Sequence, residues 1–193
     1  MGVEDAIGSE TEVRRYALTV EDFVHLDEAG AFAKVGHVEL IDGEIIELSP
    51  IHRQHARVLL DLAYGLRRVV DEARLGLVVY SPVSLKIDDH NLPQPDLLVA
   101  HAEEGDGFVD PAAVVLAVEV SASTLRHDLG RKAQLYAGRA IPEYWVVDLA
   151  GRQVRQLTDP TPDGYATRDA IPFGARVVSR KVPEIALDTS AFG

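Results

Sequence analysis

Three charged residues stand where their side chains are expected to point into the protein. Asp96 directly precedes an apolar segment, Glu119 is flanked by valines, and Lys132 lies on a predicted helix. Ionised groups are costly to bury unless they meet a partner or a metal ion. Two carboxylates and an ammonium group that converge among apolar residues therefore indicate a metal site built to stabilise negative charge.

The chemistry of these three side chains is consistent with phosphodiester hydrolysis. Mg²⁺ prefers oxygen ligands, usually one or two carboxylates together with water and phosphate oxygens. The metal can activate water and neutralise a phosphoryl group, and a nearby lysine can stabilise the same charge or position the water. We therefore expect Asp96 and Glu119 to bind Mg²⁺ (or Mn²⁺) beside Lys132, although the spacing of the three residues alone is not specific.

Two short apolar segments are expected to bring the two acids together. Residues 97–100 and 114–120 are apolar on both faces, which is typical of strands in a sheet that is covered on both sides. Sequential strands often pair, and antiparallel pairing would place residue 96 opposite 119 and residue 100 opposite 115. The structural alternative for Asp96 is a turn residue after proline. For Glu119, an acid inside an apolar strand, no such alternative is evident.

The helical phase of Lys132 turns it towards the same sheet. On a helix predicted over residues 124–140, Leu125, Leu129, Lys132 and Tyr136 project at about 0°, 40°, 340° and 20°. The lysine therefore lies within the apolar stripe that should face the sheet. The alternative is a lysine whose stem packs on the sheet while its ammonium group reaches water.

The remaining pattern predicts one mixed α/β domain. A short helix should follow Thr19, a hairpin should turn at Asp42-Gly43, and a longer helix should run from Ser49-Pro50 to about Arg74. Further strands are expected at residues 77–80, 83–87, 143–148, 154–157, 165–168 and 176–178. This order indicates a central mixed β-sheet flanked by helices. We expect residues 1–15 to form a flexible tail and residues 16–193 a single domain.

Composition limits the classes of function. The chain has 193 residues, 47% of them hydrophobic, and no cysteine, which excludes disulfides and thiolate chemistry. We see neither a membrane-spanning run nor a secretory signal pattern, so we expect a cytoplasmic protein. The formal net charge of −12 argues against strong nonspecific binding of nucleic acid. Residues 51–74 and 123–140 are nevertheless locally basic, with net charges of +2 and +3.

Several motifs together resemble the Uma2-like family of putative restriction endonucleases (DUF820), which belongs to the PD-(D/E)XK nuclease superfamily. In chain order they are Glu39-Leu40-Ile41-Asp42-Gly43-Glu44, Ser49-Pro50, His55, Gln94-Pro95-Asp96, Val118-Glu119-Val120-Ser121, Ser123-Thr124, Asp128-Leu129-Gly130-Arg131-Lys132, Leu135-Tyr136 and Ile141-Pro142-Glu143-Tyr144-Trp145-Val146-Val147-Asp148. The similarity extends from about Thr19 to near the C-terminus. One difference is Ala122, where the family usually has proline.

The resemblance implies a restriction-endonuclease-like core with an N-terminal β-hairpin and extra C-terminal strands. It implies divalent-metal-dependent endonuclease activity, with DNA as the expected substrate and with Asp96, Glu119 and Lys132 as catalytic residues. In the superfamily the lysine usually lies two residues after the second acid, where this chain has Ser121; in this family it lies on the following helix. Glu39, Glu44 and His55 match the upstream motif and are expected only to line the site.

Two other functions stay open at the level of sequence. The first is a catalytically silent module that uses the nuclease fold for binding or assembly, for instance as a homodimer, which the acidic net charge favours. The second is a hydrolase that acts on a smaller phosphate ester.

Overall fold

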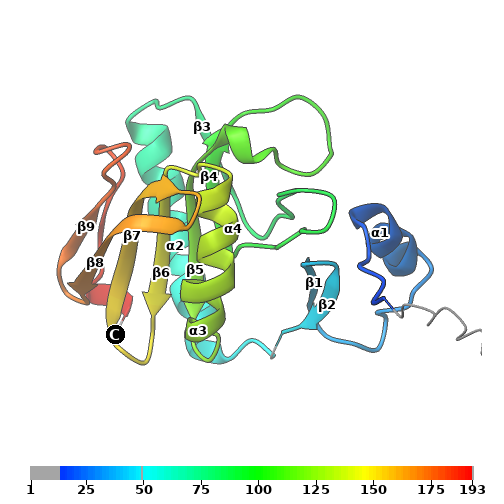
Figure 1. The fold of residues 1–193 in the computed structure, drawn as a ribbon. Coiled ribbons are helices and arrows are strands. Elements are labelled where there is room, and N and C mark those ends of the chain that lie inside the picture. Colours follow the sequence, from blue (N-terminus) through cyan, green and yellow to red (C-terminus); the bar gives the residue numbers. More distant parts are fainter. Residues whose placement is uncertain (1–13, 49, 193) are drawn as a thin grey trace, which may run out of the picture.

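A six-stranded mixed sheet forms the centre of the computed structural model, which describes residues 14–48 and 50–192 (Figure 1). Its strand order is β3-β4-β5-β6-β7-β8, and β5 and β6 are parallel while the other neighbours are antiparallel. The bounds are β3 Leu77–Tyr80, β4 Leu97–His101, β5 Val114–Ser121, β6 Glu143–Asp148, β7 Gln153–Thr161 and β8 Gly164–Pro172. The predicted mixed α/β class is confirmed.

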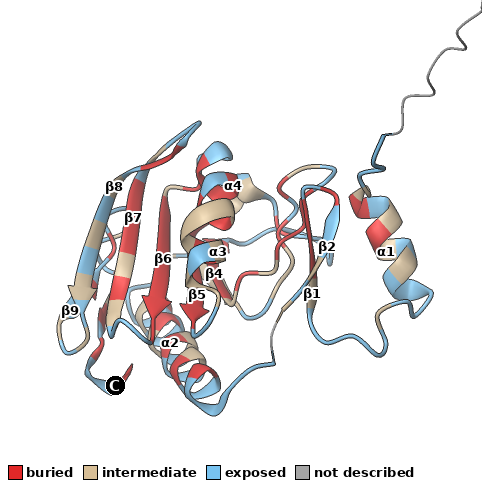
Figure 2. Cartoon of the chain, turned by 60° about the horizontal axis from the view of Figure 1, so that its bottom comes forward, coloured by how far each residue is buried: buried red, intermediate tan, exposed pale blue. Residues whose placement is uncertain are grey.

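Helices cover both faces of this sheet. On one face α2 (Arg53–Glu72) packs a stripe of buried residues at helical spacing, namely Val58, Leu62, Leu66 and Val70. On the other face α4 (Ala133–Gly138) packs Tyr136 and its neighbours. All eight residues of β5 are buried, as Figure 2 shows for the central strands. The continuous apolar sequence of these strands follows from this double coverage.

The pairing of β4 with β5 follows the predicted register over most of its length. Leu97 pairs with Val118, and the next two pairs continue the same antiparallel alignment. A register shift after Val99 then pairs Ala100 with Val114, where the sequence predicted residue 115. The shift lies at the far end of the ladder, so it leaves Asp96 close to the residues around Glu119.

The helix predicted over residues 124–140 is not uniformly α-helical. It consists of α3 (Leu125–His127), a π-helical turn (Asp128–Lys132) and α4. A π-helical turn is wider than an α-helical one, and such turns often occur at functional sites. Lys132 is the last residue of the π-helical turn, so its direction depends on this local winding.

The N-terminal hairpin lies beside the sheet with α1 (Val20–Glu28), as Figure 1 shows. Strands β1 (Val38–Ile41) and β2 (Glu44–Glu47) pair in the predicted register around Asp42-Gly43, both of which have positive φ. Positive φ at both central residues is what a type I′ hairpin turn requires. The hairpin and α1 share a small apolar core of their own, formed by Val20, Phe23, Leu40 and Leu92.

Two local predictions are wrong. The helix expected from Ser49-Pro50 begins at Arg53 with His52 as its N-cap, and Ser49 lies outside the described residues. Residues 83–87 form only isolated bridges, because Leu85 and Lys86 bond to two different loops, at Pro93 and Val109.

The C-terminal strands form a separate hairpin of β9 (Arg176–Val178) and β10 (Ala186–Asp188). Its anchor is Glu143, a fully buried carboxylate at the start of β6. This carboxylate accepts hydrogen bonds from Trp145 Nε1 and Gln156 Nε2, both at 2.6 Å, from Ser179 Oγ at 2.6 Å and from Lys181 N at 3.0 Å. The extra C-terminal strands are thus present and are joined to the sheet by this buried acid, by a 2.7 Å hydrogen bond from Gln156 Nε2 to the carbonyl oxygen of Val178, and by apolar packing of Val177 and Leu187.

Short 3₁₀ turns complete the fold at Pro111–Ala113 and Ser190–Phe192. Most of the predicted tail, residues 1–13, lies outside the described part of the chain. Within residues 14–48 and 50–192, none of the helices has the length and apolar character needed to cross a membrane.

Candidate active site

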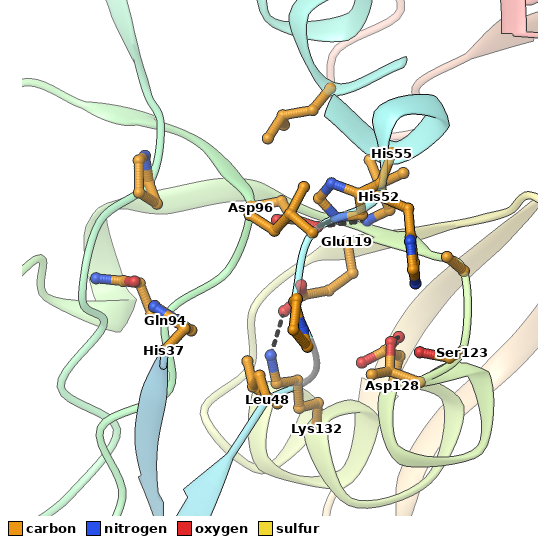
Figure 3. Close-up of a pocket in the computed structure, with 17 residues that line it drawn as sticks. His37, Leu48, His52, His55, Gln94, Asp96, Glu119, Ser123, Asp128 and Lys132 are labelled. Carbon is orange, nitrogen blue, oxygen red and sulfur yellow. Dashed lines mark hydrogen bonds and ion pairs between the residues drawn. The ribbon is translucent and has the colours of Figure 1, made fainter. Parts of the chain in front are cut away.

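A cavity of about 210 Å³ opens where the start of β4 and the end of β5 meet the beginning of α2 and the π-helical turn (Figure 3). Four of the residues expected at the site line it, namely His55, Asp96, Glu119 and Lys132. They come from four different elements, so the cavity exists only when the sheet and both helices are assembled. Their catalytic roles stay predictions, and the structure describes how they are held.

Asp96 directly precedes β4 and is fixed through one of its two oxygens. Its Oδ2 accepts a hydrogen bond from the backbone N–H of Val120 at 2.7 Å and lies 3.2 Å from His55 Nε2. The first bond ties the carboxylate to the neighbouring strand, and the second ties it to α2. Oδ1 has no partner in the described chain, and the side chain is 20% exposed, so this oxygen is available on the cavity side.

Glu119 is held in the same manner from the other face of the sheet. Because side chains alternate along a strand, Val118 and Val120 pack towards α2 while Glu119 points towards the segment of Lys132 and Tyr136. Its Oε1 accepts hydrogen bonds from Lys132 Nζ at 2.8 Å and from Tyr136 Oη at 3.2 Å. Oε2 makes no hydrogen bond with the described residues.

Burial raises the pKa of the Glu119 carboxyl well above its usual range. The ammonium group of Lys132 opposes this shift, while the carboxylates of Asp96, Asp128 and Glu39 add to it. A bound cation would stabilise the ionised form of this carboxyl, because a second positive charge would offset the effect of burial.

Lys132 points inward as predicted, with a side chain only 2% exposed. Its Nζ lies 2.8 Å from Glu119 Oε1 and 2.8 Å from Glu39 Oε1. Burial by itself would lower the pKa of this lysine, but the carboxylates of Glu119, Glu39 and Asp128 outweigh it and raise the pKa above its ordinary value. Lys132 is therefore an ammonium group at any ordinary pH.

The two hairpin glutamates that were expected to line the site have different surroundings. Glu39 is fully buried, and its Oε1 accepts hydrogen bonds from Lys132 Nζ and from the backbone N–H of Gln94 at 2.8 Å, while its Oε2 is buried without a partner. Glu44 is exposed, and its Oε1 lies 3.7 Å from Arg15 Nη1. It does not line the cavity. The structure therefore brings Glu39 to the lysine and leaves Glu44 on the surface.

Sequence reasoning did not single out two further residues of the site. Tyr136 bonds Glu119, although the helical projection treated it only as a core residue. Asp128 lines the cavity, is 2% exposed and accepts a 2.6 Å hydrogen bond from Thr124 Oγ1, and burial raises its pKa. Its position four residues before Lys132 was the available signal, because i and i+4 share a helix face.

The residues present fit a Mg²⁺ or Mn²⁺ ion that is bound mainly by water and substrate. Asp96 and Glu119 each use one oxygen for protein contacts and keep the other unbonded. No group of three His, Asp or Glu side chains within the described ranges is arranged to hold a metal ion. Two carboxylates with the remaining positions left to water and phosphate is a common way for proteins to bind Mg²⁺.

Comparisons with known proteins agree with this fold. A family model described as Uma2, putative restriction endonuclease, matches residues 20–190. A putative nuclease belonging to DUF820 from Anabaena variabilis ATCC 29413 superposes with a TM-score of 0.66 at 16% identity, covering 91% of this chain and 97% of that chain. At this identity the likeness shows the fold alone.

A second solved structure, the type IIG restriction endonuclease BpuSI, aligns with a TM-score of 0.43 at 14% identity over 66% of this chain and 15% of that chain. This alignment is too weak to bear on the site. No curated protein is significantly similar to the chain.

Proposed function

This chain belongs to the Uma2 family of putative restriction endonucleases, and from that premise we propose that it is a divalent-metal-dependent endonuclease that hydrolyses phosphodiester bonds of DNA. The observation that carries the proposal is the pairing of the two carboxylates at one cavity. Asp96 and Glu119 each keep an unbonded oxygen there, with the Lys132 ammonium group 2.8 Å from the other oxygen of Glu119.

In this proposal Asp96 and Glu119 hold Mg²⁺ or Mn²⁺, which when bound supplies charge neutralisation at the phosphoryl group and a more acidic water. The carboxylates of Glu119, Glu39 and Asp128 raise the pKa of Lys132 and favour its charged form. In that form it stabilises negative charge that builds on a phosphoryl oxygen. Val120 and His55 orient Asp96, and Tyr136 orients Glu119, so that the unbonded oxygens stay in place.

The start of α2 also favours a phosphate group at this cavity. His52, the N-cap, lines the cavity, and its side chain makes no capping hydrogen bond. The first turn contains no acidic residue. Uncapped N–H groups and the partial positive charge of a helix N-terminus attract anions. This feature supports phosphate binding at the cavity although the net charge of the chain is −12.

We expect the Asp96→Ala variant to cleave DNA at least about 100-fold more slowly than the wild-type chain, the scale of a lost transition-state contact. The measurement is a cleavage time course on single- and double-stranded DNA and on RNA with Mg²⁺, with Mn²⁺ and with a chelator. The matched control is Glu44→Ala, an acid of the same motif region that lies outside the cavity. Equal cleavage by Asp96→Ala and wild type would rule out this site.

A catalytically silent module is the second candidate, because Glu119 and Glu39 already neutralise Lys132 without a metal. Calorimetric titration with Mn²⁺ and Mg²⁺ separates the two. If the chain is an endonuclease, wild type should bind Mn²⁺, and Glu119→Gln should bind it at least about tenfold more weakly. Absence of heat with wild type would favour the silent module.

A hydrolase of a smaller phosphate ester would instead hydrolyse bis(p-nitrophenyl) phosphate faster than it cleaves DNA. The homodimer and the cytoplasmic location stay predictions from the sequence.

A further inference from the structure

A second hollow of about 520 Å³ adjoins the catalytic cavity. Residues 46–48 line one side of it, and the segment 123–131 lines the other. Leu48, Ser123 and Thr124 line both the cavity and this hollow. The two are therefore neighbours that share these three residues as a wall, and we call the second one the side hollow.

The side hollow offers positive charge that the fold itself does not use. Arg126 is exposed and forms no ion pair within the described chain. His127 lines the side hollow too, and its Nε2 is buried without a hydrogen-bond partner. Arg131, by contrast, is bonded to Asp42 through both Nε and Nη2. Arg126 is thus the charged group available to a ligand.

One acid and two apolar residues complete the lining. Glu47 is exposed and forms no ion pair with the described residues, so it partly offsets the charge of Arg126. Ile46 and Leu48 are half-buried and give the side hollow an apolar wall. A single positive group beside an apolar wall suits a nucleotide, whose phosphate is charged and whose base has a flat face that can pack on apolar side chains.

We propose that the side hollow binds the DNA strand next to the scissile phosphate, with Arg126 contacting a flanking phosphate. The inference rests on the proposed function, because it assumes that the scissile phosphate occupies the adjoining cavity. Each strand carries one negative charge for about every 3.4 Å of helix axis. A strand that enters the cavity must therefore place further phosphates close beside it, and in the adjacent side hollow one of them would meet the guanidinium group of Arg126.

The test measures DNA binding without any metal, so that no cleavage is needed. Fluorescence anisotropy with a labelled oligonucleotide, single-stranded and duplex, gives the affinity at several salt concentrations. Each neutralised phosphate adds about one to the slope of log K against log salt. Arg126→Gln should lower this slope by about 1 and weaken binding several-fold at low salt, whereas Glu47→Gln should strengthen binding.

The matched control is Arg139→Gln, which removes the same charge near the end of α4 from a residue that lines neither the cavity nor the side hollow. It should bind as wild type does. The strand site is overturned if Arg126→Gln loses no DNA affinity. It is also overturned if Arg139→Gln loses as much DNA affinity as Arg126→Gln.

A separate assay keeps the two proposals distinguishable. Hydrolysis of bis(p-nitrophenyl) phosphate by the wild-type chain tests catalysis at the cavity alone. A chain that hydrolyses this diester but binds neither oligonucleotide overturns the strand site and retains the hydrolase. A chain that neither hydrolyses this diester nor cleaves DNA, but binds DNA through Arg126, supports the strand site and overturns the proposed catalysis.

Discussion

The Lys132→Ala variant is expected to lose about 3–5 kcal/mol of unfolding free energy together with all measurable cleavage. Removing one partner of a buried ion pair leaves the other charge uncompensated, and losses of this size are typical of that change. Here the lysine is the common partner of two buried carboxylates, those of Glu39 and Glu119. The measurement is urea unfolding at neutral pH, alongside the cleavage assay.

The controls for this variant separate lost charge from lost packing. Gln134→Ala, an exposed position two residues further on, should stay within about 0.5 kcal/mol of wild type. Adding Glu39→Gln to Lys132→Ala should recover part of the loss, because it removes one orphaned charge. A double variant that is less stable than Lys132→Ala would contradict this electrostatic account, and the double-mutant cycle measures the coupling directly.

The Glu143→Ala variant is expected to lose at least about 3 kcal/mol of unfolding free energy, since several buried donors lose their acceptor at once. Trp145 and Gln156 bond Oε1, and Ser179 and Lys181 bond Oε2. Both side chains that donate to Oε1 lie in the sheet, while both donors to Oε2 lie in the C-terminal segment. The same variant should therefore loosen the β9–β10 hairpin, which keeps the hydrogen bond from Gln156 to Val178 and its apolar packing in the core.

The single tryptophan of the chain gives a direct readout of this change. Trp145 is fully buried and donates its indole N–H to Glu143. Its emission should shift in Glu143→Ala under conditions in which the variant is still folded. Glu184→Ala, an exposed acid in the same C-terminal segment, is the matched control and should change neither emission nor stability. Wild-type stability in Glu143→Ala would show that the anchor is unnecessary.

The parts of the fold that depend on local signals could be predicted from the sequence. The Asp42-Gly43 turn gave the hairpin register correctly, because a two-residue turn fixes the pairing of its strands. The pairing of two sequential strands was enough to place Asp96 near Glu119, and the period of a helix was enough to turn Lys132 towards the sheet. These features need only short stretches of chain, so no knowledge of distant contacts was required.

The parts that depend on distant contacts could not be predicted in this way. Glu39 accepts a hydrogen bond from Lys132 although the two residues are 93 positions apart in the sequence, and neither local sequence indicates this pairing. The π-helical turn is only five residues long, so the spacing of apolar residues in the sequence cannot distinguish it from an α-helical turn. Residues 83–87 have a strand-like composition, but their backbone N–H groups donate to carbonyl oxygens in two loops, at Pro93 and Val109, and not to a neighbouring strand.

The π-helical turn between α3 and α4 has a consequence for how this site tolerates insertions and deletions. A lysine on a strand two residues after the acid has its direction set by strand alternation, whereas Lys132 depends on how many residues one helical turn contains. An α-helical turn holds one residue fewer in its hydrogen-bonded ring than a π-helical turn, so loss of a single residue from Asp128–Lys132 would convert the turn to an α-helical one and keep α3 and α4 in phase. Loss of a residue inside α4 would instead rotate the helix on one side by about 100° relative to the other. A one-residue deletion should therefore be better tolerated within this turn than within α4.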